Sequence, residues 1–143
     1  MVRSKKGQRV YRQLMQGNVE KIDLNLSATN IRYILVIHQL EQSHKFVKCT
    51  DIANILSVSR PSVHAMIKTL RGMEIITKPH YGKVNFTLSG KQLAEDYSKY
   101  FDVLHAHFSK LFPQETDISN AVCAFMSQLS VQRLSAACDV IAA

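Results

Sequence analysis

The sequence has few cysteines, and they are far apart. Cys49, Cys123 and Cys138 form no Cys-x-x-Cys pair, which excludes zinc-ribbon and thioredoxin-type sites. An odd number of widely spaced cysteines is typical of reduced thiols in the cytosol. No apolar run approaches the roughly 18 residues that span a bilayer, and the basic start lacks the apolar stretch of a secretory signal. We therefore expect a cytoplasmic protein without a membrane partner.

Catalytic motifs are also missing. The sequence contains no phosphate-binding loop, no G-x-S-x-G, no H-E-x-x-H and no cluster of carboxylates. It has no internal repeat and no low-complexity segment. We therefore expect a protein that is not an enzyme.

Acidic residues are outnumbered, 11 against 18 Lys and Arg, which leaves a net charge of +7. A polyanionic partner is the simplest reason for this excess, although charge alone fits a merely basic protein equally well. Six of the basic residues, against one Glu, fall within the first 21 positions. Residues 1–26 are therefore expected to form a basic N-terminal arm, with a short helix through Val10 and Leu14. It is either a solvated tail or an arm that follows DNA.

The stretch TDIANILSVSRPSVHAMIKTL, residues 50–70, predicts two helices joined by a tight turn. Thr50 is expected to cap the first helix, residues 51–56, and Ser57-Val58-Ser59 is the turn. Ser59 caps the second helix, whose first turn tolerates Pro61. The residues expected to face inward from the first helix are Ile52, Ala53, Ile55 and Leu56.

The second helix has one apolar stripe, with spacing i, i+3, i+4 and i+7, that must face the core. The stripe consists of Val63, Met66, Ile67 and Leu70, and Gly72 is expected to end the helix. Short polar and basic side chains remain on or beside the other face, which is the composition of a helix that reads a DNA major groove. The alternative is that they form only the solvated face of a core helix.

The candidate DNA-binding residues of this helix are Ser59, Arg60, Pro61, Ser62, His64 and Lys68. The Arg60 guanidinium matches the O6 and N7 acceptors of guanine, and the two serines can hold phosphates or base edges. Lys68, two turns further on, is better suited to a phosphate.

A hairpin is expected after this helix. Residues 75–77 and 84–88 are β-type runs, and the turn between them contains Pro, Gly and three potentially cationic side chains. Beside a helix-turn-helix, such a basic hairpin is a wing. Lys78, His80 and Lys83 are therefore candidate contacts to the DNA backbone or minor groove, unless the hairpin tip is simply solvated.

The remaining segments are helical. One helix precedes residue 50, capped by Ser27 or Thr29; a long one, capped by Ser89, covers about residues 90–112. Two more are expected after caps at Thr116 and Ser130. The fold class is mainly α with a small β-hairpin wing, namely a winged helix-turn-helix followed by a helical dimerisation region. The expected domains are residues 1–26, 27–90 and 91–143; the third has a surplus of apolar residues that motivates a homodimer.

Three motifs together carry a family resemblance. They are the helix-turn-helix run above, TLSGKQLAE after the wing, and LS-VQRLSAACDV near the end. The chain from about Asn30 to Ile141 resembles the metal-dependent repressors of the diphtheria-toxin and manganese-repressor type. The resemblance implies a dimer that binds a palindromic operator, typically to control metal uptake. It also implies that residues 59–62 approach the bases.

The resemblance further implies where a metal would bind. The corresponding positions hold Arg32, Leu35, Phe101 or Asp102, Cys123, Met126 and Ser127. Only Cys123 keeps a usual ligand type of the family, whereas manganese prefers carboxylate and imidazole, and Arg32 would repel it. The weak metal candidates are Cys123, Met126 and Asp102, and the cofactor stays unknown; Cys and Met on an apolar helix are more often core.

The sequence therefore predicts a DNA-binding transcriptional regulator, a repressor, whose partner is double-stranded DNA. Two alternatives stay open. One is a winged-helix regulator controlled by a small molecule instead of a metal. The other is a winged-helix module that binds protein.

Overall fold

The computed structural model describes residues 25–43 and 46–143. In those ranges the chain forms six helices and two short strands: α2 (Ala28–Ser43), β1 (Val47–Lys48), α3 (Cys49–Leu56), α4 (Arg60–Gly72), β2 (Lys83–Val84), α5 (Leu88–Leu111), α6 (Ser119–Ser127) and α7 (Val131–Ala142). The basic arm expected over residues 1–26, with its short helix, lies outside the described residues except for Asn25 and Leu26. The expected fold class, a winged helix followed by a helical region, is confirmed.

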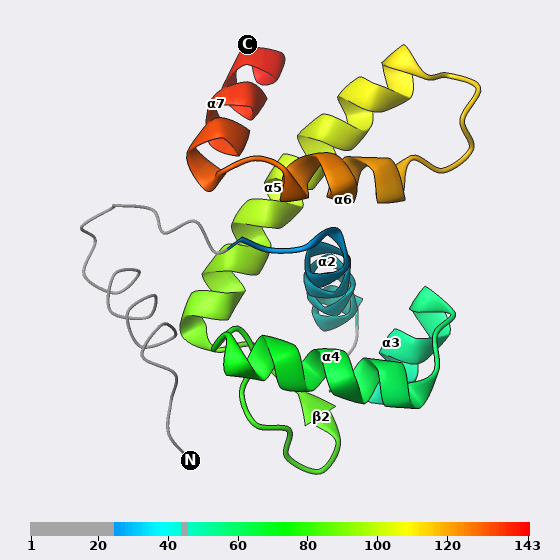
Figure 1. Cartoon of the computed structure of the whole chain (residues 1–143), viewed down its shortest axis with the longest axis vertical. Helices are drawn as coiled ribbons and strands as arrows, with labels where there is room; N and C mark the ends of the chain where they lie inside the picture. Colours follow the sequence, from blue (N-terminus) through cyan, green and yellow to red (C-terminus); the bar gives the residue numbers. More distant parts are fainter. Residues whose placement is uncertain (1–24, 44–45) are drawn as a thin grey trace.

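Helix α2 lies at the centre of the molecule (Figure 1). Helices α3 and α4 and strand β2 form one end, and α6 and α7 form the other. The long helix α5 runs from the first end to the second, so it connects both halves.

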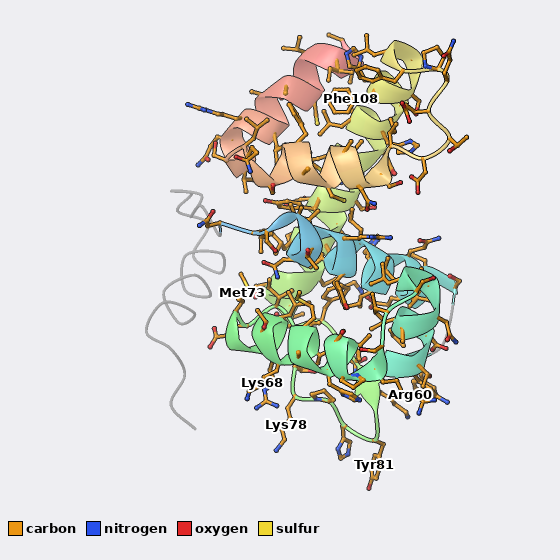
Figure 2. The ribbon with its side chains drawn as sticks, turned by 45° about the vertical axis from the view of Figure 1, so that its right-hand side comes forward. Arg60, Lys68, Met73, Lys78, Tyr81 and Phe108 are labelled. Carbon is orange, nitrogen blue, oxygen red and sulfur yellow. The ribbon has the colours of Figure 1, made fainter. Side chains whose placement is uncertain are left out.

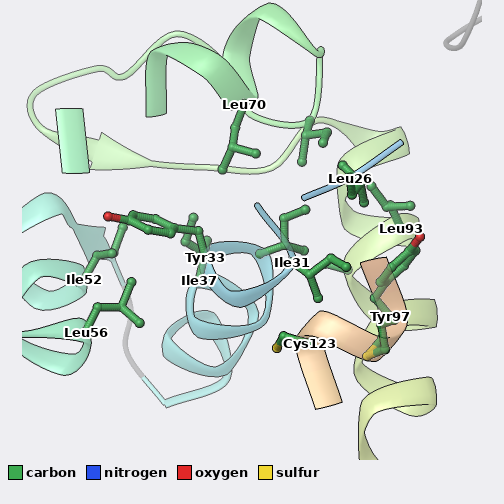
Figure 3. Close-up of a cluster of buried hydrophobic side chains, with 14 of the residues drawn as sticks. Leu26, Ile31, Tyr33, Ile37, Ile52, Leu56, Leu70, Leu93, Tyr97 and Cys123 are labelled. Atoms are coloured by element: carbon green, nitrogen blue, oxygen red, sulfur yellow. The ribbon is translucent and has the colours of Figure 1, made fainter. Parts of the chain in front are cut away.

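The central position of α2 follows from its sequence. Ser27 caps it: the Ser27 Oγ accepts the Asn30 backbone N–H, and the Asn30 Oδ1 accepts that of Ser27, both at 3.0 Å. Its apolar side chains then recur around much of the helix, and Ile31, Ile34 and Ile37 are fully buried. In Figure 3 the α2 residues lie between Ile52 and Leu56 of α3 on one side and side chains of α5 and α6 on the other. Burial on several sides makes α2 the rigid support of the neighbouring helices.

Helix α3 differs in two ways from the prediction. It begins at Cys49, so Thr50 lies inside it, and the Asp51 carboxylate accepts the Lys48 backbone N–H at 3.1 Å. Ile55 does not face inward, because its side chain is 48% exposed. With 100° of rotation per residue, Ile55 lies about 100° around the helix from the buried Ile52–Ala53 face.

The caps of α5 and α6 were also predicted wrongly. Thr87, not Ser89, caps α5: the Thr87 Oγ1 accepts the Gly90 backbone N–H at 2.9 Å. Thr116 caps nothing, because α6 begins at Ser119, whose N–H is accepted by the Asp117 carboxylate at 2.9 Å. In both places several Ser, Thr or Asp residues adjoin, and packing selects which of them meets the free N–H groups. The predicted cap at Ser130 is confirmed.

The hairpin after α4 is less regular than expected. Strand β2 pairs antiparallel with β1, with Val47 opposite Val84, so the second arm of the hairpin joins the segment before α3. The two arms of the hairpin form no continuous ladder: they meet through isolated bridges, Ile76 with Phe86 and His80 with Lys83, and through single hydrogen bonds such as that from the Thr77 N–H to the Asn85 carbonyl at 3.0 Å. Val47 and Val84 are both buried, so joining β1 to β2 buries apolar surface beneath the wing.

Candidate nucleic-acid interface

The turn between α3 and α4 has the predicted place and geometry. Ser57 adopts a left-handed conformation, φ 53°, and ends α3. Ser59 is extended, and its Oγ accepts the Ser62 backbone N–H at 3.2 Å. Pro61 lies in the first turn of α4, where a backbone N–H has no helical partner. These features set the angle at which α4 leaves α3.

Helix α4 is held to the core by one face. Val63, Ile67 and Leu70 are buried, and Met66 is partly buried, as the stripe predicts. The Asn30 side-chain amide donates to the Met66 Sδ at 3.2 Å, which adds a polar contact between α2 and α4. With this face fixed, the opposite face of α4 is presented to solvent in a defined orientation.

The solvent face of α4 carries the predicted candidates. Arg60, Ser62, His64 and Lys68 are exposed, and α4 contains no acidic residue. In Figure 2, Arg60 lies at the start of the helix and Lys68 in its second half, both on the side that also bears the wing. Eight residues separate them, or about 12 Å along the axis. The structure therefore presents one basic helical face of a length suited to a major groove.

The wing supplies a second basic element on the same side. Lys78 and His80 are exposed, and Figure 2 shows Lys78 beside the α4 face. Lys83 is half-buried, and its Nζ lies 3.7 Å from the centre of the Phe46 ring, a cation–π contact. Lys83 therefore also ties the wing to the segment before β1.

Two residues of this region were missed by the sequence reasoning. The Phe46 ring forms the cation–π contact with Lys83, and Tyr81 lies at the tip of the wing with its side chain 87% exposed. A signal existed for Tyr81, because the Gly82 that follows it marks a turn that requires positive φ. Nothing in the sequence pairs Phe46 with Lys83, which are 37 positions apart.

Residues 25–84 match the family model described as "Iron dependent repressor, N-terminal DNA binding domain". This part of the chain is therefore similar to the DNA-binding domain of the iron-dependent repressors. The match runs from the start of α2 to β2, so it contains the helix-turn-helix and most of the wing, and it ends before α5. The match supports a DNA-binding transcription regulator related to the iron and manganese repressors, and the domain that it describes binds DNA and is not catalytic. No curated protein matches the chain.

The similarity to iron-dependent repressors implies a bound metal ion. Whether one fits depends on the side chains that could act as its ligands. Among the described residues, no three His, Cys, Asp or Glu side chains come together as a metal site would require. Cys123 is buried, and burial raises the pKa of its thiol to about 11, whereas a metal binds the thiolate. Arg32 adds a positive charge close enough to act on both Cys123 and Asp117. These residues do not fit a divalent metal ion.

The other two candidate ligands, Met126 and Asp102, do not complete a metal site. Met126 is buried in α6 and supplies only a soft thioether, and Asp102 is exposed on α5. Leu35 has no donor atom. The region that the resemblance assigns to the metal is thus mainly packing between α2, α5 and α6.

One small hollow lies near this region. It has a volume of about 90 Å³ and lies where the start of α2 meets α5 and the α6–α7 connection; among its lining residues are Asn25, Tyr97, Ser127 and Ser130. Sites for drug-sized ligands measure about 300–1,000 Å³, so this hollow would hold only a few waters or a very small molecule. It lends little support to a small-molecule effector. No described helix is long and apolar enough to cross a membrane.

Proposed function

We propose that the protein is a transcriptional repressor that acts in the cytoplasm as a homodimer on a palindromic operator. In this proposal residues 27–90 are the DNA-binding domain and residues 91–143 the dimerisation domain. The observation that carries it is the exposed basic face of α4 beside the wing, within a domain of the iron-dependent repressor family.

The individual contacts follow from side-chain chemistry. Arg60, in the first turn of α4, pairs with guanine, and Lys68 binds a backbone phosphate two turns away. Ser59, Ser62 and His64 reach phosphates or base edges, and Pro61 holds the first turn in shape. In the wing, Lys78, His80 and Lys83 meet the sugar–phosphate backbone.

The homodimer is supported by apolar side chains at the other end of the molecule. Leu111 and Phe112 at the end of α5, Phe125 on α6 and Val140 on α7 are all exposed. Paired across a two-fold axis, such residues bury each other and place two copies of α4 side by side. Each α4 then reads one half-site, and the half-sites lie about one helical turn of DNA, or a multiple of it, apart.

The test measures binding of the full chain to mixed-sequence duplex DNA over a range of salt concentrations. We expect affinity to fall steeply with salt, and the double variant Arg60→Ala, Lys68→Ala to bind more weakly with a shallower salt dependence. Lys110→Ala is the matched control, because Lys110 is an exposed lysine at the far end of α5. It removes one charge outside the proposed interface.

Two results would contradict the proposal. If the wild type binds no duplex DNA at low salt, the alternative function, a winged-helix module that binds protein, explains the structure better. If it sediments as a monomer at micromolar concentration, the dimer and its two-fold operator are wrong.

A further inference from the structure

The tip of the wing is a tight turn with an unusual residue in it. The Lys83 backbone N–H donates to the His80 carbonyl at 3.1 Å, which closes the turn. Its two central residues, Tyr81 and Gly82, have φ values of 51° and 71°. Positive φ at both positions defines a type I′ turn, for which Asn-Gly is the preferred pair. A bulky residue such as tyrosine is strained in the left-handed region, so turn chemistry does not favour Tyr81.

The contacts of the Tyr81 side chain in the folded protein do not explain the tyrosine either. Its side chain is 87% exposed, and within the described part of the chain its ring contacts that of the neighbouring, exposed His80, at 4.3 Å between ring centroids. The phenol ring therefore gains little from burial that would offset the strain of its backbone.

The wing below the tip is firmly held. Lys83 packs on Phe46, the Thr77 N–H bonds to Asn85, and the Thr87 hydroxyl donates to the Glu74 carbonyl at 2.7 Å. These contacts fix both arms of the wing to the domain. Tyr81 thus projects from a hairpin whose two arms are fixed to the rest of the domain. Figure 2 shows it extending beyond Lys78 on the side that bears Arg60.

We propose that Tyr81 is a DNA-contacting residue whose hydroxyl donates a hydrogen bond to a backbone phosphate at the point where the wing meets the duplex. Tyrosine hydroxyls are among the groups that bind phosphate oxygens in protein–DNA complexes. The inference rests on the proposed function, and it adds a hydrogen bond from an uncharged group to the charged contacts proposed above. It also explains why a tyrosine occupies a position at which Asn would form the better turn.

The test compares Tyr81→Asn and Tyr81→Phe in the full chain. Asn suits the left-handed position, so we expect a melting temperature equal to or above that of the wild type. Phe keeps the ring and removes only the hydroxyl. Affinity is measured on a labelled mixed-sequence duplex of about 30 base pairs at low salt, because a phosphate contact is independent of sequence.

We expect both variants to bind about fivefold more weakly for each wing in contact with the duplex, the loss of one net hydrogen bond per subunit. The salt dependence should stay that of the wild type, because no charge is removed, whereas Lys78→Ala should make it shallower. If Tyr81→Phe binds within about twofold of the wild type, or loses affinity only together with melting temperature, the proposal is wrong whatever Tyr81→Asn does. If the wild type itself does not bind duplex, it is the proposed function that fails.

Discussion

Cys123 shows how burial changes a single group. Its thiol is buried in α6 against α2, and burial raises its pKa to about 11 from an ordinary value near 9. Between these values the unfolded chain has lost the proton that the folded chain still holds. The free energy of unfolding therefore falls as pH rises from about 9 to 11, and below about pH 9 the thiol has no such effect.

This predicts that Cys123→Ala will flatten part of that decline. Urea unfolding of both proteins at about pH 8 and about pH 10 measures it, and the comparison is the change between the two pH values in each protein. The variant can be less stable at both pH values, since it leaves a small cavity. An identical pH-dependent change in the two proteins would contradict the prediction.

At the scale of single residues, sequence reasoning worked where a position has one local solution. Ser59 caps α4 and Pro61 occupies its first turn, as predicted, because Pro61 marks the first helical turn and so selects Ser59 over Ser57. It failed for Ser89, where Thr87 lies two positions away and also reaches the Glu74 carbonyl. Two suitable caps in one segment are distinguished only by what packs around them.

At the scale of elements, Thr87 joins the wing to α5. Its Oγ1 caps the helix at 2.9 Å and donates to the Glu74 carbonyl at 2.7 Å. We expect Thr87→Ala to lower the free energy of unfolding by about 2 kcal/mol, because two hydrogen bonds are lost. Ser130→Ala removes only one capping bond and should cost about 1 kcal/mol. Equal costs in chemical denaturation would show that the contact with Glu74 adds nothing.

Gly90 marks the place where α5 approaches the chain after α4 most closely. A Cβ at this position would overlap the carbonyl oxygen of Ile75. Backbone cannot move aside as a side-chain end can, so Gly90→Ala should destabilise the protein by about 3 kcal/mol or more. Gly72→Ala is the matched control, because nothing lies within 4 Å of a Cβ there. A Gly90→Ala protein that melts like the wild type would contradict this packing.

At the scale of the whole molecule, exposed apolar side chains predict the dimer. Phe112 and Val140 are 56% and 76% exposed, and an Asp at either position adds charge without disturbing the core. We expect Phe112→Asp with Val140→Asp to shift the protein toward monomer in sedimentation and to weaken operator binding, because charges are excluded from an interface core. Gln42→Asp is the control, at an exposed position near the end of α2, away from these residues. A variant that stays dimeric would place the interface elsewhere.

The donor set predicts how the whole protein responds to metal. Since the described residues bring no suitable ligands together and Arg32 adds positive charge, a chelator should leave duplex affinity unchanged within about twofold. Binding measured with a chelator and with added manganese checks this. A gain of about tenfold with manganese would show that the implied metal switch operates in this protein.

The sequence by itself determined the helix-turn-helix, its buried stripe and the class of partner. The first two depend on spacing along one helix and on local caps, which are properties of neighbouring residues. The class of partner depends also on net charge, which is a property of the composition. Tertiary structure alone decided that Val47 pairs with Val84, that Lys83 lies on Phe46 and that Ile55 faces solvent. Each of these depends on which distant segments meet, and contacts between distant segments leave no periodic pattern in the chain.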